Sequence, residues 1–363
     1  MKRFLSSLNI VNFRGFKTFT CDSFRLITII GGKNNSGKST LLEAVCFLSN
    51  RANGAIPGKL VWNRGEKMKG RSLATLFYGA GDEGEVSIHG IFSDETTRGV
   101  SFECTHRSAV EFKLEDLPNG GFNERLPFTY VQQFYTNHGE GKVSRGAMML
   151  AFIKDEYRCY PLDPQKSDSE YLKIDGHATD DDWECVFYQS QRRNNISPVY
   201  AGIFKSGSEK KVLSYLRFVD SRIVDLAYDG EMLLVGVGNG NMRLPISVMG
   251  DGMVKAAEIL STLVMCPEGS ILCVDEIENG LHYSAMKELW KSIVCLARDR
   301  NIQLIVTTHN IEILRAIGEQ TDCVDDDEFV YLNIVRRSDD NVVAFPYAHS
   351  ELSHSLSMNL EVR

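Results

Sequence analysis

One glycine-rich stretch near the N-terminus limits the possible folds of this chain more than any other part of it. It reads Gly31-Gly32-Lys33-Asn34-Asn35-Ser36-Gly37-Lys38-Ser39-Thr40. It follows the apolar run 26–30 and leads directly into the apolar run 41–45, so we expect a strand, a glycine loop and a helix in that order. From Gly32 the spacing is G-x-x-x-x-G-K-S, the phosphate-binding loop in the context that it requires. A glycine-rich turn that only joins a strand to a helix leaves the four fixed positions unexplained.

The residue types of this loop suit a nucleotide and its metal ion. Gly32 and Gly37 let the backbone turn its N–H groups inward, and the N-terminus of the following helix faces the anion. We expect Lys38 to reach the β- and γ-phosphates and the Ser39 hydroxyl to ligate Mg²⁺. The sequence therefore predicts a site for ATP and Mg²⁺. Its nucleotide-binding residues are expected to be Gly32, Asn34, Asn35, Ser36, Gly37, Lys38, Ser39 and Thr40.

A second constellation closes the apolar run 270–274 with Asp275-Glu276. A phosphate-loop ATPase needs two such carboxylates: Asp275 for Mg²⁺, directly or through water, and Glu276 to polarise the attacking water. Another buried strand is expected over 302–308, with His309 at its carboxyl end. Ligands of open parallel sheets bind at such ends, so these residues and Lys38 are expected to converge on one edge. For His309 the alternative is a hydrogen-bonded structural histidine.

Composition excludes several classes of protein. With 363 residues and 43% hydrophobic content, the chain can form two domains or one domain with a large insertion. Nine cysteines without a C-x-x-C pair favour buried free thiols over disulfides or zinc, and hence a cytoplasmic location. No window approaches the roughly 18 apolar residues of a spanning helix, so membrane insertion is not expected. A net charge of −8 argues against a globally basic nucleic-acid binder, but it is compatible with a local basic face that binds nucleic acid.

The patterns along the chain predict an α/β fold. Residues 1–50 and 266–345 are expected to form a nucleotide-binding core around a central, mostly parallel sheet. Alternating polar and apolar residues over 84–136 predict an antiparallel β lobe. The remaining expected parts are an insertion or surface loops over 137–182, a helical lobe over 183–265 and a C-terminal tail over 346–363.

Two weaker signals precede and follow the phosphate loop. Arg14 lies between Phe13 and Phe16 in the first hairpin, from which it could reach nucleotide phosphate or ribose. The alternative is a solvated hairpin arginine whose aromatic neighbours belong to the core. Residues 51–71 contain six basic residues against the single acid Glu66. They could dock a polyanion such as DNA, or form a solvated flexible loop.

The order of these motifs resembles the ABC-type ATPase heads of the RecF, SMC, Rad50 and OLD group, and most of all the stand-alone AAA15-type ATPases. The resemblance covers about residues 1–50 and 183–345. It implies a single phosphate-loop NTPase domain of ABC-head type over 1–363. The motifs that carry the resemblance are 12–16, 32–39, 244–252, 274–282 and 307–310.

The resemblance also implies roles for residues outside the two main motifs. Gly250-Asp251-Gly252 with Ser247 would form the signature loop, which binds the γ-phosphate of the nucleotide held by a second protomer. Glycines let backbone N–H groups approach an anion, although a glycine-rich helix entry is the alternative. Residues 279–282 would line the dimer interface, and His309 would be the switch histidine. Gln189 would sense Mg²⁺ and water, with Gln191, Gln132 and Gln133 as alternatives.

The function that the resemblance implies is ATP hydrolysis coupled to formation of a homodimer or higher homo-oligomer. Only 54 residues follow His309, too few for the nuclease domain of OLD-type proteins, so any effector, a nuclease or a toxin, is expected to be a separate chain. We favour a role in prokaryotic anti-phage defence. The alternative is a RecF-like, ATP-gated DNA clamp of repair. A small-molecule kinase is disfavoured by the signature-like loop and the switch histidine.

Overall fold

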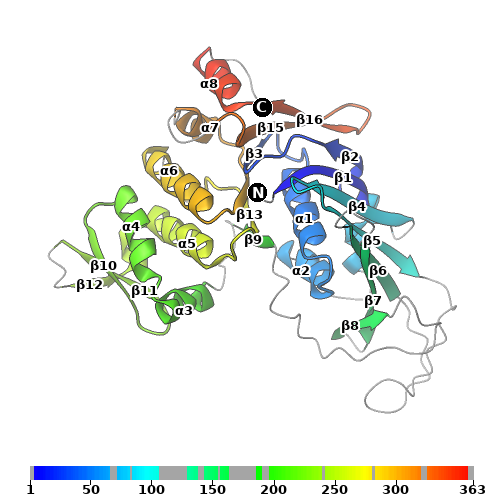
Figure 1. Ribbon diagram of the computed structural model, residues 1–363, viewed down its shortest axis with the longest axis horizontal. Helices are drawn as coiled ribbons and strands as arrows, with labels where there is room; N and C mark the ends of the chain where they lie inside the picture. The colour runs from blue at the N-terminus through cyan, green and yellow to red at the C-terminus, as the bar shows by residue number, and fades with distance from the viewer. Residues whose placement is uncertain are drawn as a thin grey trace.

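The computed structural model describes residues 4–65, 72–81, 84–105, 129–137, 143–153, 156–162, 185–189, 196–238, 242–279, 283–319 and 325–358. A six-stranded sheet forms its centre, between the lobes that lie to the left and right in Figure 1. Its strands in spatial order are β16 (Val342–Tyr347), β15 (Phe329–Arg336), β3 (Ile27–Gly31), β14 (Gln303–Thr307), β13 (Ile271–Asp275) and β9 (Cys185–Gln189). Only β16 pairs antiparallel, so the expected mostly parallel sheet is confirmed.

The central strands are buried on both faces, as their continuous apolar runs predict. Successive side chains of a strand point to opposite faces, so one strand contributes to two cores. Leu272 and Val274 belong to the core shared with the helical lobe, whereas Ile271 and Cys273 belong to the core under the β lobe. The helices of the sheet are α1 (Lys38–Ser49), α6 (Tyr283–Asp299), α7 (Ile311–Gly318) and α8 (His349–Ser357).

A seven-stranded antiparallel sheet builds the β lobe, seen on the right of Figure 1. Its order is β2 (Phe16–Cys21), β1 (Leu5–Phe13), β4 (Glu85–Phe92), β5 (Thr97–Thr105), β6 (Thr129–Asn137), β7 (Val143–Ile153) and β8 (Glu156–Leu162). The N-terminal hairpin thus pairs with the lobe instead of the parallel sheet. The sequence predicts an insertion or surface loops over 137–182. The loop alternative is wrong for 143–153 and 156–162, because β7 pairs with both β6 and β8.

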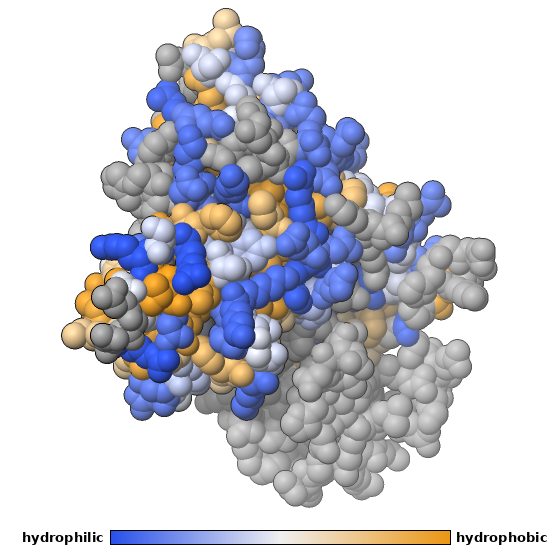
Figure 2. Space-filling model, turned by 60° about the vertical axis from the view of Figure 1, so that its left-hand side comes forward, coloured by the Kyte–Doolittle hydropathy of each residue, from blue (hydrophilic) through white to orange (hydrophobic). Residues whose placement is uncertain are grey.

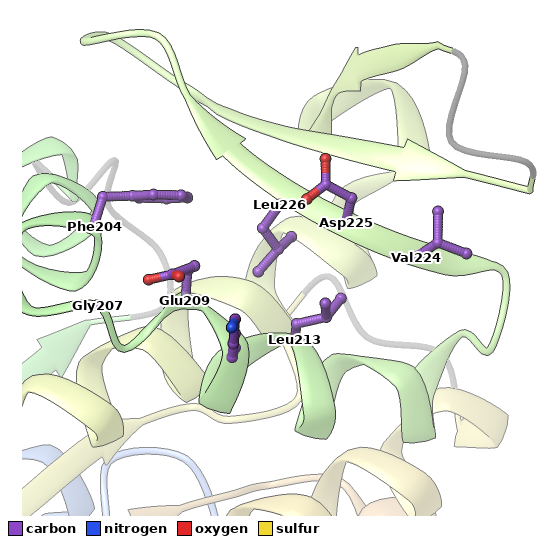
Figure 3. Close-up of a pocket in the computed structure, with 8 residues that line it drawn as sticks. Phe204, Gly207, Glu209, Leu213, Val224, Asp225 and Leu226 are labelled. Atoms are coloured by element: carbon purple, nitrogen blue, oxygen red, sulfur yellow. The ribbon is translucent and has the colours of Figure 1, made fainter.

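The helical lobe contains three helices and a small sheet that the sequence patterns only partly predict. The helices are α3 (Ser197–Ser206), α4 (Glu209–Val219) and α5 (Asp251–Met265). The sheet consists of β10 (Ile223–Tyr228), β11 (Leu233–Val237) and β12 (Arg243–Pro245), and a 3₁₀ turn, η5 (Ile246–Met249), follows it. A pocket of about 470 Å³ lies between α3, α4 and β10 (Figure 3), and none of the predicted site residues lines it.

Part of the expected C-terminal tail, residues 349–357, forms the packed helix α8. Leu352 of α8 is fully buried in the same core as α7, and the buried His349 ring lies edge-on to Phe329. Helix α8 thus packs against β15 and α7 at the edge of the central sheet. Among the described residues, no helix is both long and apolar enough to span a membrane.

Candidate functional site

The phosphate-binding loop joins β3 to α1 in a conformation that requires its glycines. Gly32 has φ 134° and Gly37 has φ 106°, which L side chains rarely adopt. A Cβ atom on Gly32 would lie 2.3 Å from the Ile334 carbonyl oxygen, and one on Gly37 would lie 2.6 Å from the Phe16 ring. Substitution at either position would therefore force the loop away from the strands that support it.

Lys38 is the first residue of α1, and its ammonium group closes the loop. Lys38 Nζ donates hydrogen bonds to the carbonyl oxygens of Gly32 at 2.8 Å and Lys33 at 2.9 Å. Burial lowers the pKa of Lys38, while the nearby carboxylates of Glu278, Glu276 and Asp275 act in the opposite direction. The lysine thus lies where a loop of this kind holds the phosphates of a nucleotide.

Ser36 provides an independent test of whether the loop fits phosphate. Its side chain is 3% exposed, and its hydroxyl makes no hydrogen bond within the part of the chain that the structure describes. A buried hydroxyl without a partner costs about 1–3 kcal/mol, which an anion in the loop would offset. Together with the N-terminus of α1, this hydroxyl and Lys38 form a cradle that fits phosphate oxygens.

Asp275 lies at the carboxyl end of β13, opposite Ser39 of α1. Asp275 Oδ1 accepts hydrogen bonds from Ser39 Oγ at 3.0 Å and from Thr307 Oγ1 at 2.6 Å. Burial raises the pKa of Asp275, and these two hydrogen bonds oppose that effect. A carboxylate and a hydroxyl oxygen side by side are ligands that suit Mg²⁺, so the residues present fit the predicted metal site.

Glu276 begins a turn that leaves the sheet. Its φ is 52°, in the left-handed region, and its backbone N–H donates to Thr307 Oγ1 at 2.8 Å. Its carboxylate accepts a hydrogen bond from Asn279 Nδ2 at 2.7 Å. Thr307 therefore joins the two acidic residues, a role that sequence reasoning missed. The available signal was a polar residue at the end of the apolar run 302–306.

His309 follows the end of β14, one strand from Asp275, where the sequence placed it. Its Nδ1 lies 2.8 Å from Glu278 Oε1, and its side chain is 45% exposed. The histidine is thus both hydrogen-bonded and accessible, so it combines features of the two alternatives. No sequence signal had assigned a role to Glu278.

Gln189 ends β9 and lies directly beside Asp275 in the strand register. Two of its competitors, Gln132 and Gln133, belong to β6 of the β lobe, and Gln132 donates to the Arg51 carbonyl oxygen at 2.6 Å. The third, Gln191, lies outside the described residues. The geometry favours Gln189 as the glutamine nearest the metal site.

Comparison with known families divides the chain into two matched parts. Residues 1–117, which include the phosphate-binding loop, match the family "AAA ATPase domain". Residues 179–315, which include Gln189, Asp275, Glu276 and His309, match the family "AAA domain, putative AbiEii toxin, Type IV TA system". The two matches thus contain the groups that the fold brings to one sheet edge. Both parts of the chain are thus similar to ATPase domains.

Curated proteins and solved structures are similar to this chain over different lengths. An "ATP/GTP phosphatase" of Helicobacter pylori is 23% identical over 337 residues, which cover 87% of this chain and 88% of that protein. An uncharacterised protein of Methanocaldococcus jannaschii is 36% identical over 135 residues, 34% of this chain and 60% of that protein. An SMC head domain from Thermotoga maritima matches with 14% identity over 94% of this chain and 98% of that one, at a TM-score of 0.45. An SMC head bound to the C-winged helix domain of ScpA matches with 13% identity over 98% and 100%, at a TM-score of 0.48.

The signature-like loop lies in the helical lobe. Gly250, with φ 92°, precedes α5, and no side chain caps the first turn of that helix. Ser247, Gly250 and Asp251 are exposed, and the loop packs mainly on β11, β12 and α5. Among the described residues, no hydrogen bond joins this loop to the phosphate-binding loop of the same chain. Within one chain, the structure therefore does not bring the two halves of the predicted site together.

Arg14 is a buried structural residue. Its Nε lies 2.7 Å from Glu43 Oε2, its Nη2 donates to the Leu60 carbonyl oxygen at 2.9 Å, and its side chain is 8% exposed. Glu43 of α1 is 1% exposed and also pairs with Arg64 at 2.9 Å. The expected contact of Arg14 with phosphate or ribose is replaced by this ion pair. The alternative is right that Phe13 and Phe16 belong to the core, and wrong that the arginine is solvated. Thr40, predicted to bind nucleotide, also faces this cluster, because its hydroxyl accepts from Arg64 at 3.4 Å.

Replacing Arg14 by Met should reduce the free energy of unfolding by about 3 kcal/mol. This loss of stability is at the lower end of that expected for breaking a buried ion pair, because Arg64 still pairs with the Glu43 carboxylate. Arg222→Met, which removes an exposed pair with Asp220, is the control and should cost less than about 1 kcal/mol. Urea denaturation measures both values. If Arg14→Met lost ATP affinity but kept its stability, the result would support the prediction that Arg14 binds nucleotide.

The described part of the basic segment 51–71, residues 51–65, forms neither a free cationic patch nor a flexible loop. Residues 55–63 form the helix α2 (Ala55–Asn63), contrary to the loop expectation. Arg51 donates to the Tyr135 carbonyl oxygen at 3.3 Å and to the Thr136 hydroxyl, and Arg64 binds Glu43. Of the other four basic residues, Lys59 lies on α2 with an exposed side chain, and Lys67, Lys69 and Arg71 lie outside the described residues. Two of the six cations thus hold the fold together.

Proposed function

We propose that this protein hydrolyses ATP at a site shared by two protomers, and that ATP-dependent dimerisation gates a separate effector in prokaryotic anti-phage defence. One observation carries the proposal. Lys38, Asp275 and Glu276 converge on one edge of the central sheet, whereas the signature-like loop is exposed on a different lobe. A second copy of the chain would supply the missing half.

Each side chain at the sheet edge has a role in hydrolysis. Lys38 would neutralise the β- and γ-phosphates, and Glu276 would accept the proton of the attacking water. Ser39 and Asp275 would hold Mg²⁺, which neutralises charge that develops on the phosphate oxygens. Gln189, beside Asp275, would contact the water shell of the ion.

The helical lobe has the surface that an association of this kind needs. The uncapped first turn of α5 presents backbone N–H groups and the positive end of the helix, which suits a γ-phosphate. Val248 in the same loop is 65% exposed and Met242 on the edge of the small sheet is 66% exposed. Figure 2 shows apolar patches between charged groups on this side of the molecule. Such side chains would become buried against a second protomer.

A matched family supports the proposed biological role. One matching family is described by a type IV toxin–antitoxin system, and its match contains the catalytic carboxylates. The effector is proposed as a separate nuclease or toxin, because the described elements are all accounted for by the head and its two lobes. A RecF-like DNA clamp would need a basic groove, and the structural bonds of Arg51 and Arg64 disfavour one at 51–65.

If the site is shared, ATPase activity per protomer should rise with protein concentration and then reach a plateau. Val248→Glu should shift this curve to higher concentration, because a charge would enter the dimer interface. Met358→Glu is the control, since Met358 is 60% exposed on the other side of the fold, after α8. Light scattering measures the association in parallel. A monomer with full, concentration-independent turnover would contradict the shared site and favour a self-contained phosphate-loop enzyme.

A further inference from the structure

Glu278 is a buried carboxylate that touches the histidine of the site. Its side chain is 5% exposed, while the His309 side chain beside it is 45% exposed. Glu278 Oε1 accepts a hydrogen bond from the backbone N–H of His309 at 2.7 Å and lies 2.8 Å from His309 Nδ1. A single carboxylate oxygen thus holds both the main chain and the ring of the same residue.

The turn after β13 explains why Glu278 points inward. The left-handed conformation of Glu276 reverses the chain, and the next residue, Ile277, is fully buried and donates its N–H to the Thr307 carbonyl oxygen at 3.1 Å. The turn is therefore fastened to the end of β14. Because His309 lies two residues after the end of β14, a side chain at position 278 meets it. Backbone hydrogen bonds therefore help to set the position of Glu278, and its contact with His309 does not act alone.

An ionised carboxylate only accepts hydrogen bonds, so it selects the protonation pattern of an imidazole beside it. With Glu278 at Nδ1, the ring proton is held on Nδ1, and Nε2 lies on the opposite side of the ring. Glu278 also affects Lys38. Burial lowers the pKa of Lys38, and the charge of Glu278 is the largest of the influences that raise it. The carboxylate therefore lies among the functional groups and not at the periphery.

Glu278 makes a poor stabilising residue. Its second oxygen, Oε2, is buried and makes no hydrogen bond to the described residues, which leave out 280–282. Burying a carboxylate with an unpaired oxygen is unfavourable. A buried carboxylate that holds a half-exposed histidine at such a cost is better explained by its effect on the histidine than by stability.

We propose that Glu278 is a positioning residue that holds the proton on His309 Nδ1 and fixes the ring so that Nε2 is presented to the nucleotide. The inference rests on the proposed function only in its assumption that His309 acts on a bound nucleotide. Glu278 itself touches neither substrate nor metal in this role. Its effect on hydrolysis passes entirely through the imidazole.

The direct test is the tautomer of His309 without nucleotide. In ¹⁵N spectra of the eight histidines, the signals that disappear in His309→Ala identify His309. The full chain should show the Nδ1-protonated form at this residue. Glu278→Ala should shift it towards the Nε2-protonated form, and Glu278→Gln, which keeps an acceptor oxygen and the side-chain volume, should give a smaller change. An unchanged tautomer in both variants would overturn the proposal.

Kinetics test whether the effect passes through His309. Glu278→Ala should lower kcat about 10–100-fold, as loss of a residue that orients a functional histidine does, with little change in KM. In the His309→Ala background the same substitution should cause no further loss. Glu319→Ala, an exposed acid paired with Lys287, is the control and should leave kcat unchanged. Additive losses would mean that Glu278 acts independently of His309.

The two readouts separate this inference from the proposed function. Turnover could be independent of protein concentration while Glu278→Ala loses the Nδ1-protonated form of His309. That result would contradict the shared site and support the positioning role of Glu278. Turnover that rises with protein concentration, together with an unchanged His309 tautomer in Glu278→Ala, would support the shared site and contradict the positioning role. If Glu278→Ala does not fold, Glu278→Gln carries both measurements, because it retains the buried volume.

Discussion

Lys38→Ala should abolish nucleotide binding, whereas Glu276→Gln should keep it and slow hydrolysis by at least about 10²-fold. Lys38 is the cation that the structure places inside the phosphate-binding loop, so its loss leaves the phosphate charge without a side-chain counterpart there. Glu276 lies at the end of β13 and contributes to the chemical step instead of the affinity. Titration with ATP and single-turnover hydrolysis measure the two effects separately.

Matched controls distinguish these roles from general damage to the fold. Lys287→Ala and Glu319→Gln remove the same kinds of side chain from an exposed pair, and both should behave like the natural protein. Because Lys38 also bonds two loop carbonyls, its variant must be shown to unfold at a temperature similar to that of the natural protein without nucleotide. Equal loss of ATP affinity in the Lys38 and Glu276 variants would show that the roles are wrongly assigned.

Mixing two inactive variants, Lys38→Ala and Gly250→Asp, should restore part of the ATPase activity. Each variant lacks one half of every site, but a mixed dimer contains one site in which both halves are intact. At equal amounts and random pairing, about one quarter of all sites should be complete. Titrating one variant into the other should therefore give an activity maximum near equal amounts, provided that one competent site turns over without its twin.

Gly250→Asp has a close structural control in the same lobe. Gly250 has φ 92° and Gly230 has φ 105°, and a Cβ atom added to either would meet no atom within 4 Å. Gly230→Asp therefore introduces the same charge and similar backbone strain, about 1–2 kcal/mol, away from the signature-like loop. It should retain activity. Failure to recover activity at any mixing ratio, with both variants able to form dimers, would refute the shared site.

The sequence alone was enough to place the main motifs on the right elements. A strand, a glycine loop and a helix are local features, because glycine spacing and apolar runs act over a few residues. The carboxyl ends of β3, β13 and β14 meet because parallel strands align in one direction, which follows from the βαβ pattern. Lys38, Asp275, Glu276 and His309 therefore converge as expected. The strands β7 and β8 were missed because the polar residues of 137–182 resemble surface loops.

The tertiary structure decided which partners the charged residues have. Nothing in the residues around Arg14 indicates that Glu43, on the inner face of α1, would neutralise it. Likewise, the pairing of Glu278 with His309 depends on a backbone reversal at Glu276 and on the register of β13 with β14. The chemical type of a side chain limits what it can bind, but its partner depends on distances between elements far apart in the chain. Those distances are set by strand register and helix packing, which no local pattern contains.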